Sequence, residues 1–272
     1  MSAANVRPEE ARPLQRSRLY WAFADGWVLA KRNLVQIPRI PELLVFATIQ
    51  PVMFVLLFRY VFGGAIDVGG ESYVNYLMAG IFVQTVAFGA VTTGIGLAED
   101  LKRGLVDRFR SLPMSRSAVL TGRTIADLVR NVFVVLVMLL VGLLVGFRPE
   151  AGVAGWAGAV GLLLLLSFSF SWIGATVALL IGSVEAVQSA GFIWLFPLTF
   201  ASSAFVQTDN MPDILRAFAN NQPITLIVDT VRGLLLDRPV GPEGWQALAW
   251  CLGILLVFVP LSVSLYRRVS AR

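Results

Sequence analysis

The residue types that could do chemistry gather in one charged stretch between two long apolar runs. Seven of the twelve residues from Glu99 to Arg110 are ionisable, whereas Asp, Glu, Lys and Arg make up only 14% of the whole chain. Leu101, Leu105 and Phe109 recur at intervals of four, which on a helix forms one apolar stripe. Such an amphipathic helix either lies on anionic lipid or docks against a soluble partner. The residues of the stretch leave both interpretations open.

Side chains for acid–base or nucleotide chemistry are scarce. The chain has no histidine, the commonest general base and a frequent metal ligand. Its lysines are Lys31 and Lys102, and neither follows a glycine-rich phosphate-binding loop. We therefore expect a chain that is not an enzyme and that binds no metal or cofactor, with any ATP and Mg held by a separate ATPase subunit. An intramembrane enzyme is disfavoured for the same reason.

The composition predicts an integral membrane protein. Hydrophobic residues form 57% of the chain and the mean hydropathy is +0.74, whereas a soluble domain carries about a quarter charged residues. The net charge of +5 fits basic loops beside a membrane, so we expect membrane lipid and no nucleic acid among its partners. The single cysteine, Cys251, lies in an apolar run and excludes an intrachain disulfide.

Apolar runs of about 20 residues, the length that crosses a bilayer, predict an all-α fold with six transmembrane helices. Residues 1–42 would be a cytosolic tail with an interfacial amphipathic helix, and 43–272 a single transmembrane domain. The six predicted spans are Leu43–Phe62, Val74–Leu97, Leu128–Phe147, Gly155–Ile181, Val187–Val206 and Gln246–Tyr266.

Basic residues predict the orientation of these spans. Of the 22 Lys and Arg residues, 17 lie in the N-terminal tail, the 99–130 segment and the C-terminal end, which six spans place on one side. The positive-inside rule puts that side, and both termini, in the cytoplasm. The opposite side carries a segment of about forty residues before the last span. In it we expect short external re-entrant helices at about 211–236, with Asp229 and Arg232 paired three residues apart.

Polar and aromatic groups within the spans have two interpretations. Small and hydroxyl side chains commonly serve helix packing, and aromatic rings commonly face lipid. A minority would line a route for an amphipathic substrate, and the candidates are Gln50, Gln84, Phe88, Trp172 and Trp194. Two further acidic residues have simpler roles: Asp127 is expected to pair with Arg123 or Arg130, and Glu185 is either a solvated turn residue or a partner contact.

The run from Gly104 to Arg116, which continues to Asn131, closely resembles the signature of ABC transporter type-2 permeases. Within that family it is most similar to the daunorubicin-resistance-type exporters of drugs and lipids. The Gln50-Pro51 pair, Phe58–Gly64, Ser183–Ala186 and Pro223–Thr225 resemble that branch too.

The resemblance implies an ABC exporter permease in a bacterial-type cell membrane. Its partners would be two cytosolic ABC ATPase subunits and a second permease, in a homodimer or a heterodimer. The charged stretch, at about 99–112, would be the coupling helix. A passive channel or an assembly scaffold without ATP coupling is the alternative. The residues implied in ATPase coupling are Glu99, Asp100, Leu101, Lys102, Arg103, Gly104, Leu105, Asp107, Arg108, Phe109 and Glu185.

Overall fold

The computed structural model describes residues 31, 41–66, 68, 70, 72–104 and 116–269, and every regular element within these residues is a helix. The predicted tail and interfacial helix lie almost wholly outside them. The elements are α2 (Pro41–Leu56), η2 (Leu57–Phe62), α3 (Tyr73–Lys102), α5 (Arg116–Leu144), α6 (Val153–Ile181), α7 (Val184–Phe200), η3 (Thr208–Asn210), α8 (Asp213–Asn221), α9 (Pro223–Leu235) and α10 (Glu243–Val269).

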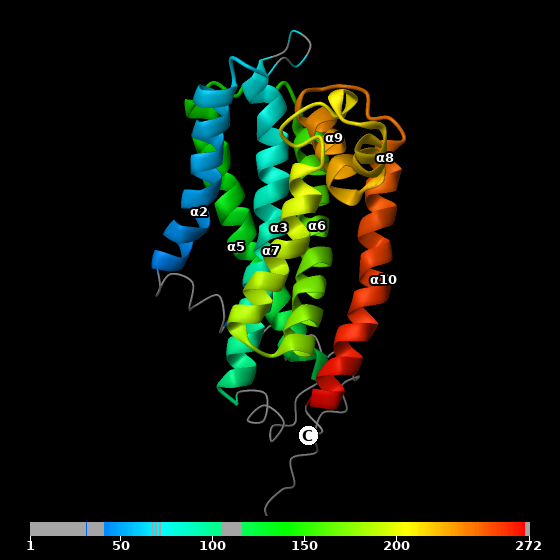
Figure 1. Ribbon diagram of the computed structural model, residues 1–272. Helices are drawn as coiled ribbons and strands as arrows, with labels where there is room; N and C mark the ends of the chain where they lie inside the picture. Colours follow the sequence, from blue (N-terminus) through cyan, green and yellow to red (C-terminus); the bar gives the residue numbers. More distant parts are fainter. Residues whose placement is uncertain are drawn as a thin grey trace, which may run out of the picture.

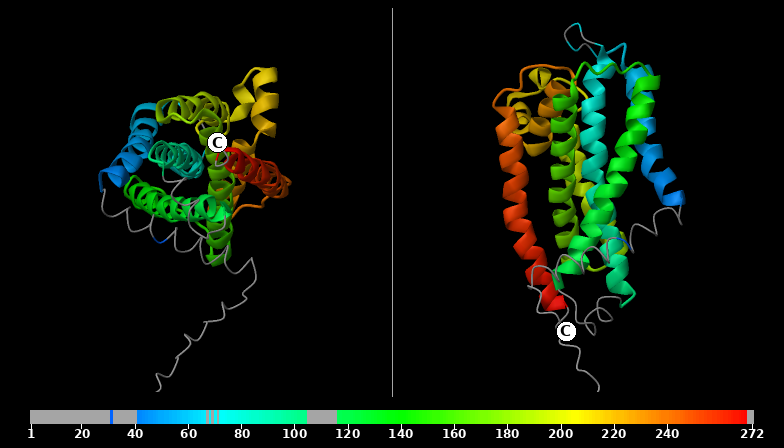
Figure 2. Two further views of the ribbon diagram at one scale, coloured as in Figure 1. Left: turned by 90° about the horizontal axis from the view of Figure 1, so that it is seen from below. Right: turned by 180° about the vertical axis from the view of Figure 1, so that it is seen from behind.

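The long helices run side by side with α3 at the centre (Figure 1). Seen along the bundle, α3 is ringed by α2, α5, α6 and α7, and α10 lies outside against α6 (Figure 2). The burial of these helices agrees with this arrangement. In the most apolar stretch of each helix, 83% of the residues are buried in α3 but only 17% in α10. The short helices α8 and α9 gather at one end, which we call the α9 end; the other we call the C-terminal end.

Among the described residues, four helices are long and apolar enough to cross a bilayer: α3, α5, α6 and α10. They coincide with the second, third, fourth and sixth predicted spans. The first predicted span is α2 continued by the π-helical η2, and the fifth is α7, which has 17 residues. Both are apolar but shorter, so the count of six spans stays a prediction.

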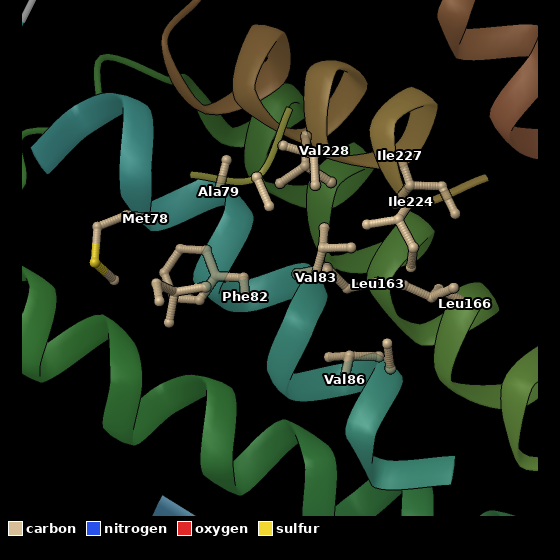
Figure 3. Close-up of a cluster of buried hydrophobic side chains, with 14 of the residues drawn as sticks. Met78, Ala79, Phe82, Val83, Val86, Leu163, Leu166, Ile224, Ile227 and Val228 are labelled. Carbon is tan, nitrogen blue, oxygen red and sulfur yellow. The ribbon is translucent and has the colours of Figure 1, made fainter. Parts of the chain in front are cut away.

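Packing around α3 depends on small residues where backbones meet. A Cβ at Gly174 of α6 would overlap the carbonyl oxygen of Ala90 in α3, and a Cβ at Gly80 would overlap that of Ala204. Larger residues fill the space beside these contacts. In Figure 3, Val83 of α3 points towards Leu163 of α6, below Val228 of α9, whereas Phe82 points to the other side of α3. The core therefore joins α3 to α6 and to the short helix α9.

A tight turn reverses the chain between α6 and α7. Gly182 ends α6 in the left-handed region, at φ +77°, where glycine avoids the strain of a side chain. Ser183 follows as the N-cap of α7, and its hydroxyl accepts from the Ala186 amide at 3.4 Å. This turn brings Glu185, in the first turn of α7, to the C-terminal end.

Candidate functional site

A continuous row of phenylalanine rings connects α2, η2, α7 and α3. Neighbouring ring centroids lie 4.5–6.1 Å apart, within the range of favourable aromatic contacts. The closest pair, Phe58 and Phe205, is stacked at 4.5 Å with planes 9° apart. We call this row the phenylalanine ladder; its members are Phe54, Phe58, Phe62, Phe88, Phe192, Phe196, Phe200 and Phe205.

The spacing of the rings explains the ladder. Phe54, Phe58 and Phe62 follow one another at intervals of four along α2 and η2, and so do Phe192, Phe196 and Phe200 along α7. Residues four apart lie on one face of an α-helix. Sequence reasoning missed this site, although the two matched runs of Phe were the signal that would have found it.

The ladder is partly open at the surface. Phe196 and Phe200 are 37% and 39% exposed, and Met53 and Ile193, each next to a ladder residue in the sequence, are exposed as well. Aromatic faces of this kind bind other flat apolar groups through dispersion and offer no acid–base group. The arrangement can therefore hold an apolar molecule, whether lipid or substrate, but it has no chemistry to transform one.

The predicted substrate-path residues do not form one cluster. Phe88 belongs to the ladder, and Gln84 lies one turn away on α3, buried, with no hydrogen-bond partner for its amide among the described residues. Trp194 contacts Phe170 rather than the ladder, at 5.5 Å between centroids. Trp172 belongs to a second core cluster with α10, and Gln50 is exposed on α2. Their role in transport stays a prediction.

The predicted coupling residues lie partly within the described chain. Residues 99–102 form the last turn of α3, and Gly104 follows at φ +67°. Leu105, Asp107, Arg108 and Phe109 lie outside the described residues. Glu185 is exposed at the same C-terminal end as residues 99–104. This position is compatible with a contact to a partner subunit, and the role of Glu185 in coupling stays a prediction.

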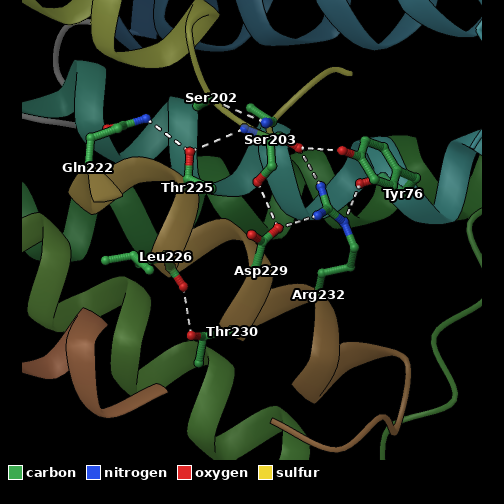
Figure 4. Close-up of polar contacts among 10 residues, drawn as sticks. Tyr76, Ser202, Ser203, Gln222, Thr225, Leu226, Asp229, Thr230 and Arg232 are labelled. Carbon is green, nitrogen blue, oxygen red and sulfur yellow. Dashed lines mark hydrogen bonds and ion pairs between the residues drawn. The ribbon is translucent and has the colours of Figure 1, made fainter. Parts of the chain in front are cut away.

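The chain leaves helical geometry after α7, and side chains satisfy the backbone there. Residues 201–206 are irregular, so their buried carbonyls need donors from elsewhere. The hydroxyl of Tyr76 donates to the Ser203 carbonyl and that of Tyr73 to the Phe205 carbonyl, each at 2.9 Å. Both tyrosines begin α3, so α3 fixes the position of this irregular segment. Figure 4 shows the contact of Tyr76 with Ser203.

Gln222 connects the same segment to α9. Its Nε2 donates to the Leu198 carbonyl, and its Oε1 accepts from the Ile224 amide, both at 2.9 Å. The side chain thus caps α9 while it holds the end of α7.

Arg232 completes this polar network at the α9 end. Its guanidinium pairs with Asp229 at 2.6 Å, as predicted, donates to the carbonyls of Ser203 and Tyr76, and lies 3.7 Å from the centre of the Tyr76 ring. Burial raises the pKa of Asp229, although the Arg232 charge and the Ser203 hydroxyl both oppose this shift. Arg232 bonds to residues of α3, of α9 and of the segment after α7. The network is therefore a structural anchor for α9.

Comparison with known proteins identifies the family. The model of the ABC-2 type transporter family matches residues 25–236. The chain belongs to this family. It is 34% identical, over 88% of its length and 85% of the relative, to the daunorubicin resistance ABC transporter permease protein of Streptomyces coeruleorubidus.

Two further relatives cover most of this permease. The probable doxorubicin resistance ABC transporter permease protein of Mycobacterium tuberculosis is 28% identical over 82% of this chain and 81% of its own. Nodulation protein J of Sinorhizobium fredii is 25% identical over 74% of this chain and 76% of its own. The permease is therefore a multi-pass membrane subunit, and its family implies an ABC ATPase as partner.

Proposed function

We propose that this permease is the transmembrane subunit of an ATP-driven exporter for a hydrophobic or amphipathic substrate such as a drug, an antibiotic or a lipid. The substrate leaves the cytoplasm or the inner leaflet. Two permeases, identical or related, assemble with two cytosolic ABC ATPase subunits in a bacterial-type cell membrane. Both termini lie in the cytoplasm, so the C-terminal end of the bundle is the cytoplasmic end.

The phenylalanine ladder is the observation that carries the substrate class. Its partly exposed rings, among them Phe62, Phe196 and Phe200, offer flat apolar surfaces on η2 and α7, and Phe88 continues the row onto the middle of α3. The two relatives above whose names refer to daunorubicin or doxorubicin resistance are consistent with an apolar cargo. The amide of Gln84 lies one turn from Phe88 and would serve a polar group of such a substrate.

ATP drives transport only if nucleotide binds two states of the complex with different affinity. We assign this coupling to the end of α3 and the residues after it, from Glu99 to Phe109, together with Glu185. The described part of this set lies at the C-terminal end, where cytosolic ATPases would bind. The permease itself hydrolyses no ATP and binds no cofactor.

Transport in proteoliposomes tests this function. The tagged permease is purified with the ATPase that accompanies it, and ATP-dependent movement of fluorescent amphiphiles is measured. Export should require hydrolysable ATP, and the permease without its ATPase should show no hydrolysis. Phe196→Ala should lower export at least fivefold, whereas Leu256→Ala, which removes an exposed side chain of α10 outside the ladder, should leave it within twofold.

The passive alternative gives a different result. Movement of the same amphiphiles at equal rates with and without ATP would replace the exporter by a channel. Equal effects of Phe196→Ala and Leu256→Ala would remove the ladder from the substrate route.

A further inference from the structure

Four charged side chains form a row between α3 and α5 at the C-terminal end. Arg123 Nη1 lies 2.9 Å from Asp100 Oδ2, and Arg130 Nη1 lies 2.9 Å from Asp127 Oδ1. Arg130 Nη2 also donates to the carbonyl of Gly89 at 3.3 Å. These pairings confirm the prediction for Asp127. We call the four charged residues the charge row.

The charge row fits into notches in α3. A Cβ at Gly96 would overlap the guanidinium of Arg123, and a Cβ at Gly89 would overlap the amide of Asn131. Gly96 and Gly89 are two helical turns apart, about 10 Å. Asn131 also donates to Ser167 of α6 at 2.8 Å. The row therefore reaches from the rim of the bundle to the middle of α3.

The charge row has equal numbers of positive and negative side chains, but one carboxylate oxygen has no hydrogen-bond partner among the described residues. Two arginines face two aspartates, and the four side chains are 7–22% exposed. Asp127 Oδ2 has no hydrogen-bond partner among the described residues, and Arg123 Nε lies 4.0 Å from it. An unpartnered carboxylate oxygen is costly at such a buried site. Arg123 therefore has a second acceptor that it reaches by moving about 1 Å towards a normal hydrogen-bond length.

We propose that Arg123 exchanges Asp100 for Asp127 when the end of α3 is displaced. In the first position, Arg123 holds Asp100 and the rim of α3 against α5. In the second position it satisfies Asp127 Oδ2 and releases Asp100, which lies nearer the rim than Asp127. Each position keeps one arginine–carboxylate hydrogen bond: the first leaves Asp127 Oδ2 without a partner, and the second leaves Asp100 without Arg123.

The exchange alters the middle of α3 through Arg130. Asp127 forms an ion pair with Arg130, and Arg130 donates to the Gly89 carbonyl. Phe88, which directly precedes Gly89, belongs to the phenylalanine ladder. A displacement at Asp100 thereby reaches the ladder. This role in transport rests on the proposed function, whereas the change of partner by Arg123 does not.

Distances between spin labels test the exchange without any ATPase. Labels are placed at Lys102→Cys on α3 and Val129→Cys on α5, both exposed, in a Cys251→Ala background diluted with unlabelled permease. Asp127→Asn removes the second acceptor charge and should give the wild-type distance. Asp100→Asn removes the charge of the first acceptor and should lengthen the distance between the two labels. Equal distances in the two variants would overturn the exchange.

A charge swap separates the exchange from a purely structural pair. Asp100→Arg with Arg123→Asp keeps the ion pair but forbids the second position, because two aspartates then face each other. We expect this double variant to assemble with its ATPase and to keep the wild-type label distance, yet to export at least tenfold less substrate per ATP hydrolysed. Restored export would show that the pair is only structural.

Asp213→Asn is the matched control, because it breaks an ion pair with Arg216 on exposed α8. Export by this variant should stay within twofold of wild type. If the wild-type permease shows no ATP-dependent export, the proposed function fails, and the spin-label distances still decide whether Arg123 changes its partner.

Discussion

Arg232 shows how a single side chain sets the position of a whole helix. It bonds to the carbonyls of Tyr76 and Ser203 and to Asp229, and so connects α9 to α3 and to the irregular end of α7. Only 9% of its side chain is exposed. Removing the cation leaves the Asp229 carboxylate without its partner charge and takes one donor from each of the Tyr76 and Ser203 carbonyls.

Arg232→Gln should therefore destabilise the permease by ~1–3 kcal/mol, because Arg232 and its hydrogen bonds are buried whereas the Asp229 side chain, 36% exposed, is partly screened by solvent. Thermal unfolding in detergent measures the effect as a lower melting temperature. Arg216→Gln serves as the control, since its pair with Asp213 is exposed. It should cost less than ~1 kcal/mol. Equal melting temperatures for the two variants would show that Arg232 does not anchor α9.

Sequence reasoning reached the pairs that lie within one turn of a helix. The partners of Asp229 and Asp127 were predicted because residues three or four apart face each other on a helix. The bonds of Arg232 to Tyr76 and of Arg123 to Asp100 join residues 156 and 23 positions apart. No local spacing contains that information, so it required the structure.

At the scale of elements, the sequence predicted which segments are helical better than how they pack. Hydropathy located the four long helices, since each one is a long apolar run. It placed the fifth span through Val206, whereas α7 ends at Phe200. Pro197 lies in the last turn, and the carbonyls beyond it are satisfied by tyrosines of α3. This compensation is a tertiary feature that hydropathy does not measure.

The packing of α3 on α6 supplies a test at this scale. Gly174→Leu should disrupt the contact, because any side chain there meets the Ala90 carbonyl. We expect a loss of ~3 kcal/mol or more, the upper end of overpacking. Gly161→Leu is the control on the same helix, where a Cβ would meet nothing within 4 Å. Detergent-resistant folded protein, measured by size-exclusion chromatography after heating, should fall for Gly174→Leu alone.

At the scale of the whole molecule, the orientation in the membrane rests on charge. The 17 basic residues assigned to one side include those of the 99–130 segment and the C-terminal end, and α3 and α10 do end together in the structure. The α8–α9 region lies at the other end of the bundle. The positive-inside rule therefore predicts that this region faces outward.

Cysteine labelling in intact cells checks this orientation. In a Cys251→Ala background, Thr208→Cys and Pro239→Cys should react with a membrane-impermeant thiol reagent. Lys102→Cys, which is exposed at the opposite end, should react only after lysis. The reverse pattern would invert the topology and place the α8–α9 region in the cytoplasm.

The enclosure of α3 also has a consequence for how the permease is made. Thr93 of α3 bonds to Ser171 of α6, a residue 78 positions later in the chain. At a synthesis rate of about 5–20 residues per second, that partner is made ~4–16 s after Thr93. During this interval the helix that will be most enclosed has neither α6 nor α7 beside it, and its polar groups need shelter from the hydrocarbon. We therefore expect α3 to reach its enclosed position only after α6 and α7 have entered the membrane beside it.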